Sequence, residues 1–564
     1  MVTLFEQKPE ELAKTTEKVV EAEVIPNNLP VAISTTTKNF FHNLSVLKSK
    51  STAASDQTIK VSEVLGAIAL IYEKIRNVIE YKGEHVIRRN AIERILKRLL
   101  WERSTADANR IAHNLLRELI WARYFPNDSV PKSKTHQVAA IINKYITLLN
   151  SLLAKETFTS DLSLKNWVWG VASAEIEEAL DPSFREPYVE FMHEWFTTSF
   201  EWLNDTLSDH EKQIQIYLAI HRALVKSDIE IMRYHLLVKE LPDWPEADDT
   251  TVRKVSDNFF SLYKEIEKHI DFPEATLLYR SIQKQTAPFE VFRELVKEQG
   301  TAIDSILKDQ EKFNLKIREI CQRKYKQIQT KVNRGIVRSI LYIFITKVIF
   351  AMLLEIPYEI WALGRLRYIP IGINIIIPPS MMFFIGMTIR APSEKNTLRI
   401  LDKLHQVVYT GASQTKARFS LVRAGPGRIL GRLFAFIYLL LFFLVFGGIT
   451  YLLLLLNFSW VGVGVFFIFL SLVLLFGFRV RYAAMELRVT TDREGIFEYV
   501  FNNLTLPFLS TGVILSKGLA KLNIFTVILD FLIEAPLKTI IEIVEEWTSF
   551  MREKRDEVVE VPDQ

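Results

Sequence analysis

The clearest pattern in the chain is one long apolar run near its C-terminal third. Between Arg432 and Arg479 the only ionisable side chains are tyrosines, and the run is broken only near residues 457–460. Each half supplies roughly the 20 apolar residues that a helix needs to cross a bilayer. Because backbone polar groups in lipid must be paired internally, both halves should be helical. Residues 433–478 are therefore predicted to form a transmembrane hairpin with a short outer turn.

Two earlier apolar segments, 336–356 and 368–389, predict a first transmembrane pair within residues 335–389. The connector at 357–367 carries two arginines, but the parity of four spans places it outside. Residues 508–533 are also apolar. Lys517, Lys521 and Asp530 would be costly at mid-bilayer, so we expect this segment to be interfacial and not a fifth span.

The pattern before residue 335 is that of amphipathic helices. Apolar residues recur every three or four positions, and strand-like alternation is nearly absent. We find no fixed repeat period, which argues against a solenoid. The sequence predicts an all-α fold with a mobile N-terminal arm (1–56) and a helical domain (57–300). Residues 301–334 are densely charged, with apolar positions near the heptad spacing of a coiled coil, and predict a helical stalk that continues into the first span.

Basic residues set the expected orientation. The loop 390–432 holds nine Lys or Arg against two acidic residues, and it includes a predicted amphipathic helix at 393–408. Seven of its basic residues are candidate contacts for anionic lipid headgroups: Arg390, Lys395, Arg399, Lys403, Arg423, Arg428 and Arg432. The positive-inside rule places this loop, the helical domain and the C-terminal helices and tail (479–564) in the cytoplasm.

The N-terminus lacks the basic segment and apolar core of a cleavable signal peptide. We therefore expect a multi-pass protein of the inner (plasma) membrane, with both termini cytoplasmic. The net charge of +4 over 564 residues is too small to indicate nucleic acid as a partner. The expected partners are membrane lipids, a second copy of the chain, and a cytosolic protein.

A few residues elsewhere in the chain could in principle take part in catalysis or metal binding. The single cysteine, Cys321, excludes an intramolecular disulfide and a multi-cysteine metal site. Nearby Arg323 and Lys324 could lower its pKa, but no histidine lies close in sequence, so a catalytic role is not favoured. Glu190 and His193 have the E-x-x-H spacing of di-iron bundles, but that site needs a second copy of the motif. Because common catalytic and nucleotide motifs are absent as well, we predict neither an enzyme nor a cofactor.

The helix predicted at 85–98 is strongly basic on one side. One interpretation is a surface for anionic lipid or nucleic acid. The favoured alternative is a solvated helix face, because interleaved acidic residues such as Glu93 can form i,i+4 pairs with its basic side chains.

The sharpest candidate site lies within the first transmembrane pair. Lys347 is near the middle of its span, and an ionisable residue at that depth is a functional candidate. Asn374 should lie at a similar depth in the antiparallel second span, followed by Pro378 and Pro379, which free backbone carbonyls. Broken helices of this kind often line transporter cavities. The favoured alternative is a packing role, in which Lys347 pairs with Asn374, a freed carbonyl or a snorkelling path. Glu355, at the outer end, is its nearest acidic neighbour.

Three short runs resemble stretches of uncharacterised multi-pass membrane proteins of candidate-phylum bacteria. They are residues 338–347, 355–358 and 533–538. The resemblance implies membrane insertion and no particular activity. Two functions remain open from the sequence. The first is a membrane-anchored structural or scaffolding protein; the second is an oligomeric channel or transporter built around Lys347, Asn374, Pro378 and Pro379.

Overall fold

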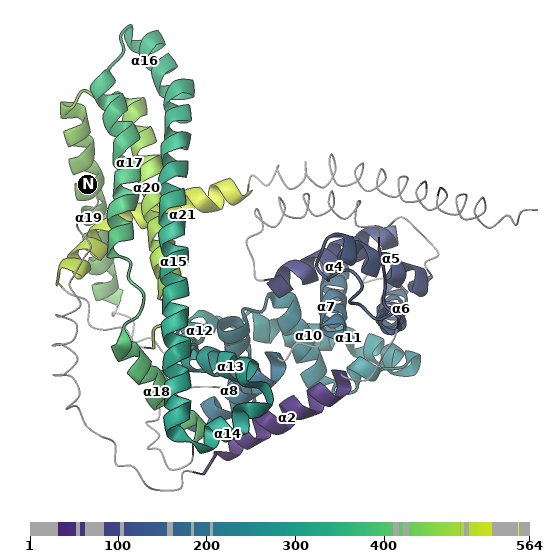
Figure 1. The fold of residues 1–564 in the computed structure, drawn as a ribbon. Coiled ribbons are helices and arrows are strands. Elements are labelled where there is room, and N and C mark those ends of the chain that lie inside the picture. Colours follow the sequence, from purple (N-terminus) through teal and green to yellow (C-terminus); the bar gives the residue numbers. More distant parts are fainter. Residues whose placement is uncertain are drawn as a thin grey trace, which may run out of the picture.

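The protein is almost entirely helical in the computed structural model, which confirms the predicted all-α class (Figure 1). The structure describes residues 32–51, 57–61, 84–101, 107–154, 162–181, 185–203, 207–409, 417–420, 428–485, 487–489 and 496–521, and residues 547 and 551. The predictions for residues 1–31, for Arg423, and for nearly all of the chain after Lys521 lie outside these residues.

Most of the chain before residue 309 forms one large bundle. Its helices are α2 (Thr35–Ser51), α4 (Glu84–Trp101), α5 (Ala108–Trp121), α6 (Ser133–Leu153), α7 (Leu162–Leu180), α8 (Arg185–Ser199), α9 (Asp209–Ile220), α10 (Ile229–Glu240), α11 (Asp249–Ile270), α12 (Ala275–Gln283), α13 (Thr286–Gln299) and α14 (Ile303–Lys308). A π-turn, η1 (His221–Val225), and 3-10 turns η2 (Trp244–Glu246) and η3 (Gly300–Ala302) lie between them. Polar caps start several helices. Ser208 and Glu211 form a capping box before α9, which satisfies backbone donors that the first turn leaves free.

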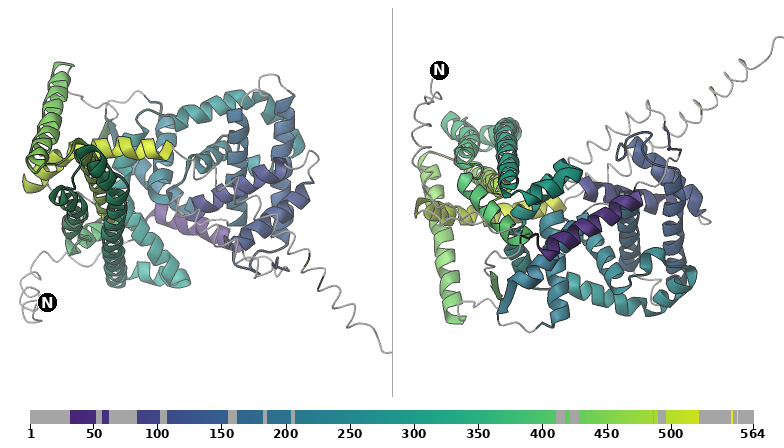
Figure 2. Two further views of the ribbon diagram at one scale, coloured as in Figure 1. Left: turned by 90° about the horizontal axis from the view of Figure 1, so that it is seen from above. Right: turned by 60° about the horizontal axis from the view of Figure 1, so that its bottom comes forward.

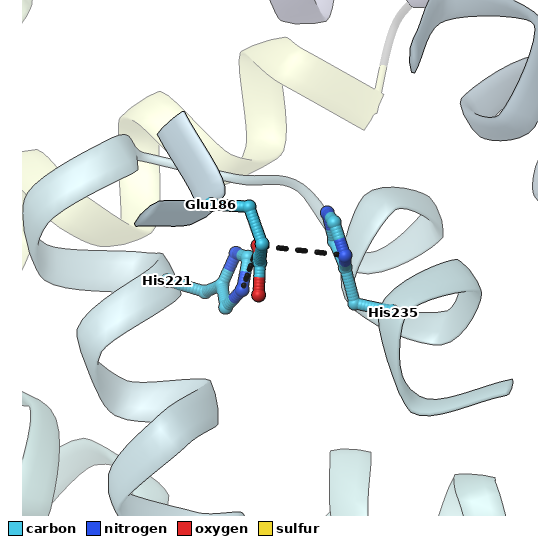
Figure 3. Close-up of side chains that lie close together, drawn as sticks. All are labelled: Glu186, His221 and His235. Carbon is cyan, nitrogen blue, oxygen red and sulfur yellow. Dashed lines mark ion pairs between the residues drawn. The ribbon is translucent and has the colours of Figure 1, made fainter. Parts of the chain in front are cut away.

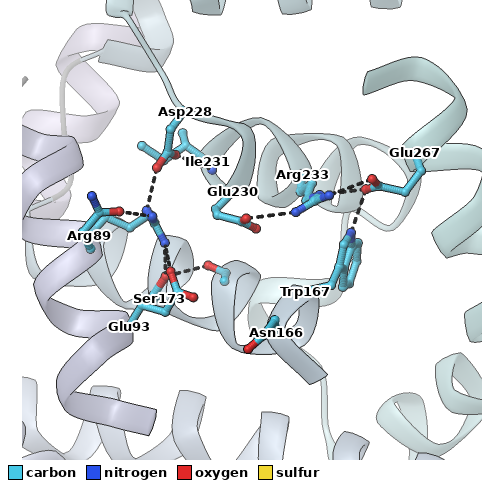
Figure 4. A network of polar contacts seen from close by, with 12 residues as sticks. Arg89, Glu93, Asn166, Trp167, Ser173, Asp228, Glu230, Ile231, Arg233 and Glu267 are labelled. Carbon is cyan, nitrogen blue, oxygen red and sulfur yellow. Dashed lines mark hydrogen bonds and ion pairs between the residues drawn. The ribbon is translucent and has the colours of Figure 1, made fainter. Parts of the chain in front are cut away.

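The basic side of α4 is turned into this bundle (Figure 4). Arg88 and Arg89 are 8% and 4% exposed. Arg88 pairs with Glu177 of α7 at 2.6 Å, and Arg89 pairs with Asp228 at 2.9 Å. These two side chains are therefore neither a basic binding surface nor part of a solvated face. The predicted i,i+4 pairing is nevertheless present, because Glu93 pairs with both Arg89 and Lys97. Glu177 and Asp228 could not be identified as partners from the sequence because they lie on other elements, whereas Glu93 could.

The second half of the chain supplies a smaller group of helices beside and above the large bundle (Figure 1). They are α15 (Gln310–Phe350), the π-turn η4 (Ala351–Glu355), α16 (Ile356–Leu363), α17 (Tyr368–Thr388), α18 (Glu394–Val408), α19 (Arg428–Leu455), α20 (Trp460–Ala484) and α21 (Ile496–Lys521). Within the described residues, four helical segments are long and apolar enough to cross a membrane: Gln310–Ala362, Tyr368–Thr388, Leu430–Leu455 and Trp460–Tyr482. This agrees with the four predicted spans and is consistent with a membrane protein.

Helix α15 belongs to two separate hydrophobic cores. Phe313, Ile317 and Ile320 are at most 1% exposed within the core of the large bundle. Ile336 and Ile343, further along the same helix, belong to a second core shared with α17, α20 and α21. The helix starts at Gln310, because the Asp309 side chain accepts a hydrogen bond from the Lys312 backbone N–H and caps it. The 301–308 part of the expected continuous helix is instead η3 and α14.

Helix α18 forms where an amphipathic helix was predicted, but its apolar face is covered by protein. Ile400, Leu404 and Val408 are at most 1% exposed and belong to the core of the large bundle. Asn396 donates to the Tyr325 hydroxyl of α15 at 2.8 Å. Nearby, β1 (Phe200–Leu203) pairs in parallel with β2 (Ala417–Ser420). These contacts attach α18 and β2 to the large bundle.

The packing of α21 differs from the sequence expectation. A proline normally marks a helix boundary, but α21 continues through Pro507 to Lys521. It crosses the neighbouring helices instead of running parallel to them (Figures 1 and 2). At the crossing, Gly512 lies so close to α20 that an added Cβ would be 2.6 Å from the Ser471 carbonyl oxygen. This tight packing outweighs the local cost of a proline within the helix. Unlike α21, helix α19 makes little contact with its neighbours: only 6% of its most apolar segment is buried within the protein.

Candidate functional site

A polar cluster lies among the candidate spans, where α15, η4, α17 and α20 meet. Lys347 comes from the last turn of α15, and Glu355 from the end of the π-turn that follows. Pro357, in the first turn of α16, has no backbone N–H to donate, and the widened turn directly precedes it. Asn374 comes from the middle of α17. The sequence expectation that Lys347 and Asn374 lie at a similar depth agrees with this arrangement.

Glu355 is the centre of the cluster. Its Oε1 is 2.8 Å from the Lys347 Nζ, and its Oε2 accepts a 2.8 Å hydrogen bond from the Asn374 Nδ2. Asn374 also donates to the Gly462 carbonyl of α20 at 3.3 Å. The Lys347 ammonium lies 4.4 Å from the ring centroid of Phe469. Lys347 therefore pairs with Glu355, and not directly with Asn374, a freed carbonyl or a snorkelling path as the packing alternative had it.

The cluster is enclosed and carries no net charge. Lys347, Glu355 and Asn374 are 0%, 4% and 1% exposed. An ammonium and a carboxylate in direct contact cancel each other's charge, and each would be costly to bury alone. One buried atom, the Asn374 Oδ1, has no hydrogen-bond partner. The geometry is that of a buried ion pair with an amide support.

Pro378 and Pro379 are buried one turn after Asn374, inside an uninterrupted α17. Each lacks a backbone N–H, so the helix cannot supply a donor to the carbonyls four residues earlier, at Asn374 and Ile375. The proline pair therefore concentrates unpaired backbone acceptors at the level of the cluster. Within the described residues, Glu355 bonds to Lys347 and to the Asn374 Nδ2, and Lys347 does not bond to these freed carbonyls.

A second group of polar contacts lies at the end of the candidate spans that is away from the large bundle. Glu359 is 3% exposed, and its Oε2 accepts a 2.7 Å hydrogen bond from the Arg367 backbone N–H. The Arg367 guanidinium donates to the Asn457 carbonyl at 2.6 Å. Asn457 has a left-handed φ of 61° in the turn between α19 and α20. Arg367, one of the two arginines in the connector at 357–367, thus links that connector to the turn between α19 and α20.

The candidate lipid-binding residues that the structure describes do not share one surface. Lys395, Arg399 and Lys403 are carried by α18, beside the lower half of α15 (Figure 1). Glu394 pairs there with Arg318 at 2.9 Å, and Arg318 precedes Arg334 by sixteen residues, about 24 Å along a helix. Arg390 is exposed just after α17, and Arg432 is exposed in the first turns of α19, which also contain Arg428.

Two other sequence candidates are separated from any common site. Glu190 accepts from Asn43 at 3.1 Å, whereas the His193 ring contacts the Gln213 carbonyl at 3.1 Å. Cys321 is fully buried in the core of the large bundle, so the neighbouring basic residues do not make it an accessible thiolate. Comparison with known proteins gave no match to a family model, to a curated protein or to a solved structure.

Sequence reasoning left Glu355 out of the candidate set because it was assigned to the outer end of the span. The sequence did offer one indication of the pairing: Glu355 lies eight residues after Lys347, which is about two helical turns. Since side chains on a helix lean toward its N-terminus, Glu355 leans back toward Lys347. Phe469 carried no signal, because one aromatic residue in an apolar run cannot be distinguished from a lipid-facing one.

Proposed function

We propose that this chain is an integral protein of the inner membrane that holds a large helical bundle at the cytoplasmic face as a scaffold for protein interaction. The observation that carries the proposal is α15, which is 41 residues long and belongs to both hydrophobic cores. A continuous helix fixes the distance and orientation between two parts of a protein, whereas a flexible linker does not. Such an attachment suits a protein that presents a surface at a set height above the bilayer.

The proposed orientation follows from basic residues at one end of the spans. Arg334 and Arg338 of α15, Arg432 of α19, and Arg479 and Arg481 of α20 lie at the end nearer the large bundle. The positive-inside rule assigns that end to the cytoplasm. We propose headgroup contacts for Arg390 and Arg432, and not for Lys395, Arg399 and Lys403, because α18 carries these three along the bundle.

The intramembrane cluster supports a structural contribution more than transport. Lys347 has a carboxylate partner and is fully buried, so it is not presented to a passing solute. A transport role predicts that purified wild-type protein moves solutes across proteoliposomes and that Lys347→Met abolishes this flux. The scaffold proposal predicts no flux in either protein.

Photo-crosslinking in intact cells tests the scaffold role. A photoreactive amino acid replaces Leu315 of α15 or Leu398 of α18, which are 60% and 49% exposed. The matched control is Leu444 of α19, which is 61% exposed within a candidate span. We expect discrete adducts with a second polypeptide, or with another copy of this chain, at the two bundle positions and none at Leu444. If neither bundle position gives a protein adduct, the scaffold proposal fails.

A further inference from the structure

Three side chains that no sequence motif connects converge inside the large bundle (Figure 3). Glu186 comes from the first turn of α8, His221 opens the π-turn η1, and His235 lies in α10. Their ligand-type atoms all lie within 4.8 Å of one another. His221 is 1% exposed. The three residues together are called the Glu-His-His cluster below.

Two of the three distances within the Glu-His-His cluster, those that involve Glu186, match the spacing of ligands around a bound cation. The Glu186 Oε2 is 3.4 Å from the His221 Nε2 and 3.5 Å from the His235 Nδ1. These separations are long for N–H···O hydrogen bonds, whose distances are about 2.7–3.2 Å. Two ligands of a tetrahedral zinc ion, each about 2.0–2.2 Å from the metal, are about 3.3–3.6 Å apart.

Two of the three converging atoms make no hydrogen bond, although they face each other at 3.4 Å. The Glu186 Oε2 and the His221 Nε2 are buried and have no hydrogen-bond partner. Leaving buried polar atoms unpaired is costly, so such atoms call for an explanation. Figure 3 shows the Glu186 carboxylate between the two imidazole rings, with an ion pair to each.

The opposite atoms of the same side chains are held by outer partners. The Tyr217 hydroxyl donates to the Glu186 Oε1 at 2.6 Å, which leaves Oε2 turned toward the histidines. The Ser227 hydroxyl contacts the His221 Nδ1 at 3.1 Å, which leaves Nε2 toward Glu186. Outer contacts of this kind orient metal-binding side chains and fix the histidine tautomer. His221 is further positioned by the π-turn, a local distortion often found at functional sites.

A small cavity adjoins the Glu-His-His cluster. Its volume is about 10 Å³, and Glu178 and Arg185 are among its lining residues. This is roughly the space that one water or one small cation requires. It is too small for an organic substrate, so the cavity favours an enclosed ion over a reacting centre.

We propose that Glu186, His221 and His235 bind one divalent cation of the zinc type, with a water at the fourth position. Two imidazoles and one carboxylate form a ligand set that suits zinc and disfavours magnesium or calcium, which prefer oxygen ligands. The ion joins α8, η1 and α10, which are separated in sequence, so its role is to stabilise the large bundle.

The test uses the full chain in detergent, stripped with a chelator and then loaded with Zn²⁺ or Co²⁺ alone. We expect one Zn²⁺ per chain by elemental analysis, a raised thermal unfolding midpoint, and the visible d–d absorption of tetrahedral Co²⁺. If the wild-type chain takes up neither ion stoichiometrically and its midpoint does not move, the cluster is a metal-free contact and the proposal is wrong.

Variants then locate the site. Glu186→Gln, His221→Gln and His235→Gln should each weaken Zn²⁺ binding at least about tenfold, and Ser227→Ala should weaken it less without abolishing it. His193→Gln, on α8 but outside the cluster, is the matched control and should bind as the wild type does. Binding that survives all three cluster substitutions would overturn the assignment. Where a cluster variant does not fold, Ser227→Ala and the wild-type Co²⁺ spectrum still decide.

Discussion

Lys347 and Glu355 each make the burial of the other tolerable. Both are nearly inaccessible, and the ammonium–carboxylate distance is 2.8 Å. Removing one partner of a buried pair leaves an uncompensated charge, whereas replacing both with apolar side chains is often nearly neutral. The pair therefore adds specificity to how α15 packs against α17 more than it adds net stability.

A double-mutant cycle measures this directly. Lys347→Met and Glu355→Leu should each lower the free energy of unfolding in detergent by about 3–5 kcal/mol, and the double variant should lose less than either single variant. Glu319→Gln, in an exposed pair with Lys316 on the same helix, is the control and should change stability by about 0.5 kcal/mol or less. Strictly additive losses would show that the two charges do not stabilise each other.

His85 makes the stability of the large bundle depend on pH in the acid range. Burial, followed by the positive charges of Arg185 and Arg88, lowers the pKa of His85 to about 4 from an ordinary value of 6.5. Its Nε2 is buried without a hydrogen-bond partner. Between these two pKa values the unfolded chain binds more protons than the folded one, so this contribution to stability is complete above pH 6.5 and is lost as the pH falls toward 4.

The corresponding variant is His85→Gln, which cannot take up a proton. We expect the thermal unfolding midpoint of the wild type to fall more than that of the variant between pH 7 and pH 5. The measurement is thermal unfolding of both proteins in the same detergent at each pH. Parallel curves for the two proteins would contradict the assignment.

Individual residues differ in how far sequence could reveal them. Lys347 and Asn374 stood out because polar side chains are rare in apolar runs. Glu186, His221 and His235 could not be connected, since they are spread over 50 residues on three elements without a diagnostic spacing. The burial of Arg88 and Arg89 was missed for a related reason: Glu177 lies on α7 and Asp228 at the start of α10, and only the Glu93 partner of Arg89 was visible in the sequence.

At the scale of elements, close packing between helices explains where the structure differs from what the local sequence pattern predicts. The α20–α21 crossing is the clearest case, since Gly512 of α21 lies against the backbone of Ser471 while Gly518 of α21 has no atom near its missing Cβ. The two glycines thus provide a test within one helix.

Gly512→Ala should destabilise the protein by about 1–3 kcal/mol, because the new methyl group meets backbone that cannot move aside cheaply. Gly518→Ala should be neutral or stabilising by up to about 1 kcal/mol, because alanine favours the helix. Thermal unfolding in detergent compares the two. Equal effects would mean that α21 does not approach α20 as described.

Helix positions were largely predictable, since they follow from the recurrence of apolar residues and from long apolar runs. The end of α21 and the partner of α18 were not. A proline normally signals a helix boundary, and an amphipathic face in a basic loop suits a membrane surface as well as a protein core. Only the tertiary contacts of Gly512, Ile400 and Leu404 distinguish these outcomes.

At the scale of the whole molecule, the proposed orientation can be tested with an impermeant maleimide. In a Cys321→Ser background, Trp361→Cys of α16 should react in intact spheroplasts, because this position is 88% exposed and lies at the end of the spans away from the large bundle. Glu319→Cys, at the bundle end of α15, should react only after permeabilisation. The reverse pattern would invert the topology and place the bundle outside.

The length of α15 has a mechanical consequence. Its 41 residues correspond to about 60 Å. Spanning helices change tilt when the thickness of the hydrocarbon layer changes. For a straight rod of this length, a tilt of about 10° displaces one end by about 10 Å relative to the other. Because the first turns of α15 are embedded in the large bundle, a modest thinning of the bilayer would displace the whole bundle sideways relative to the spans.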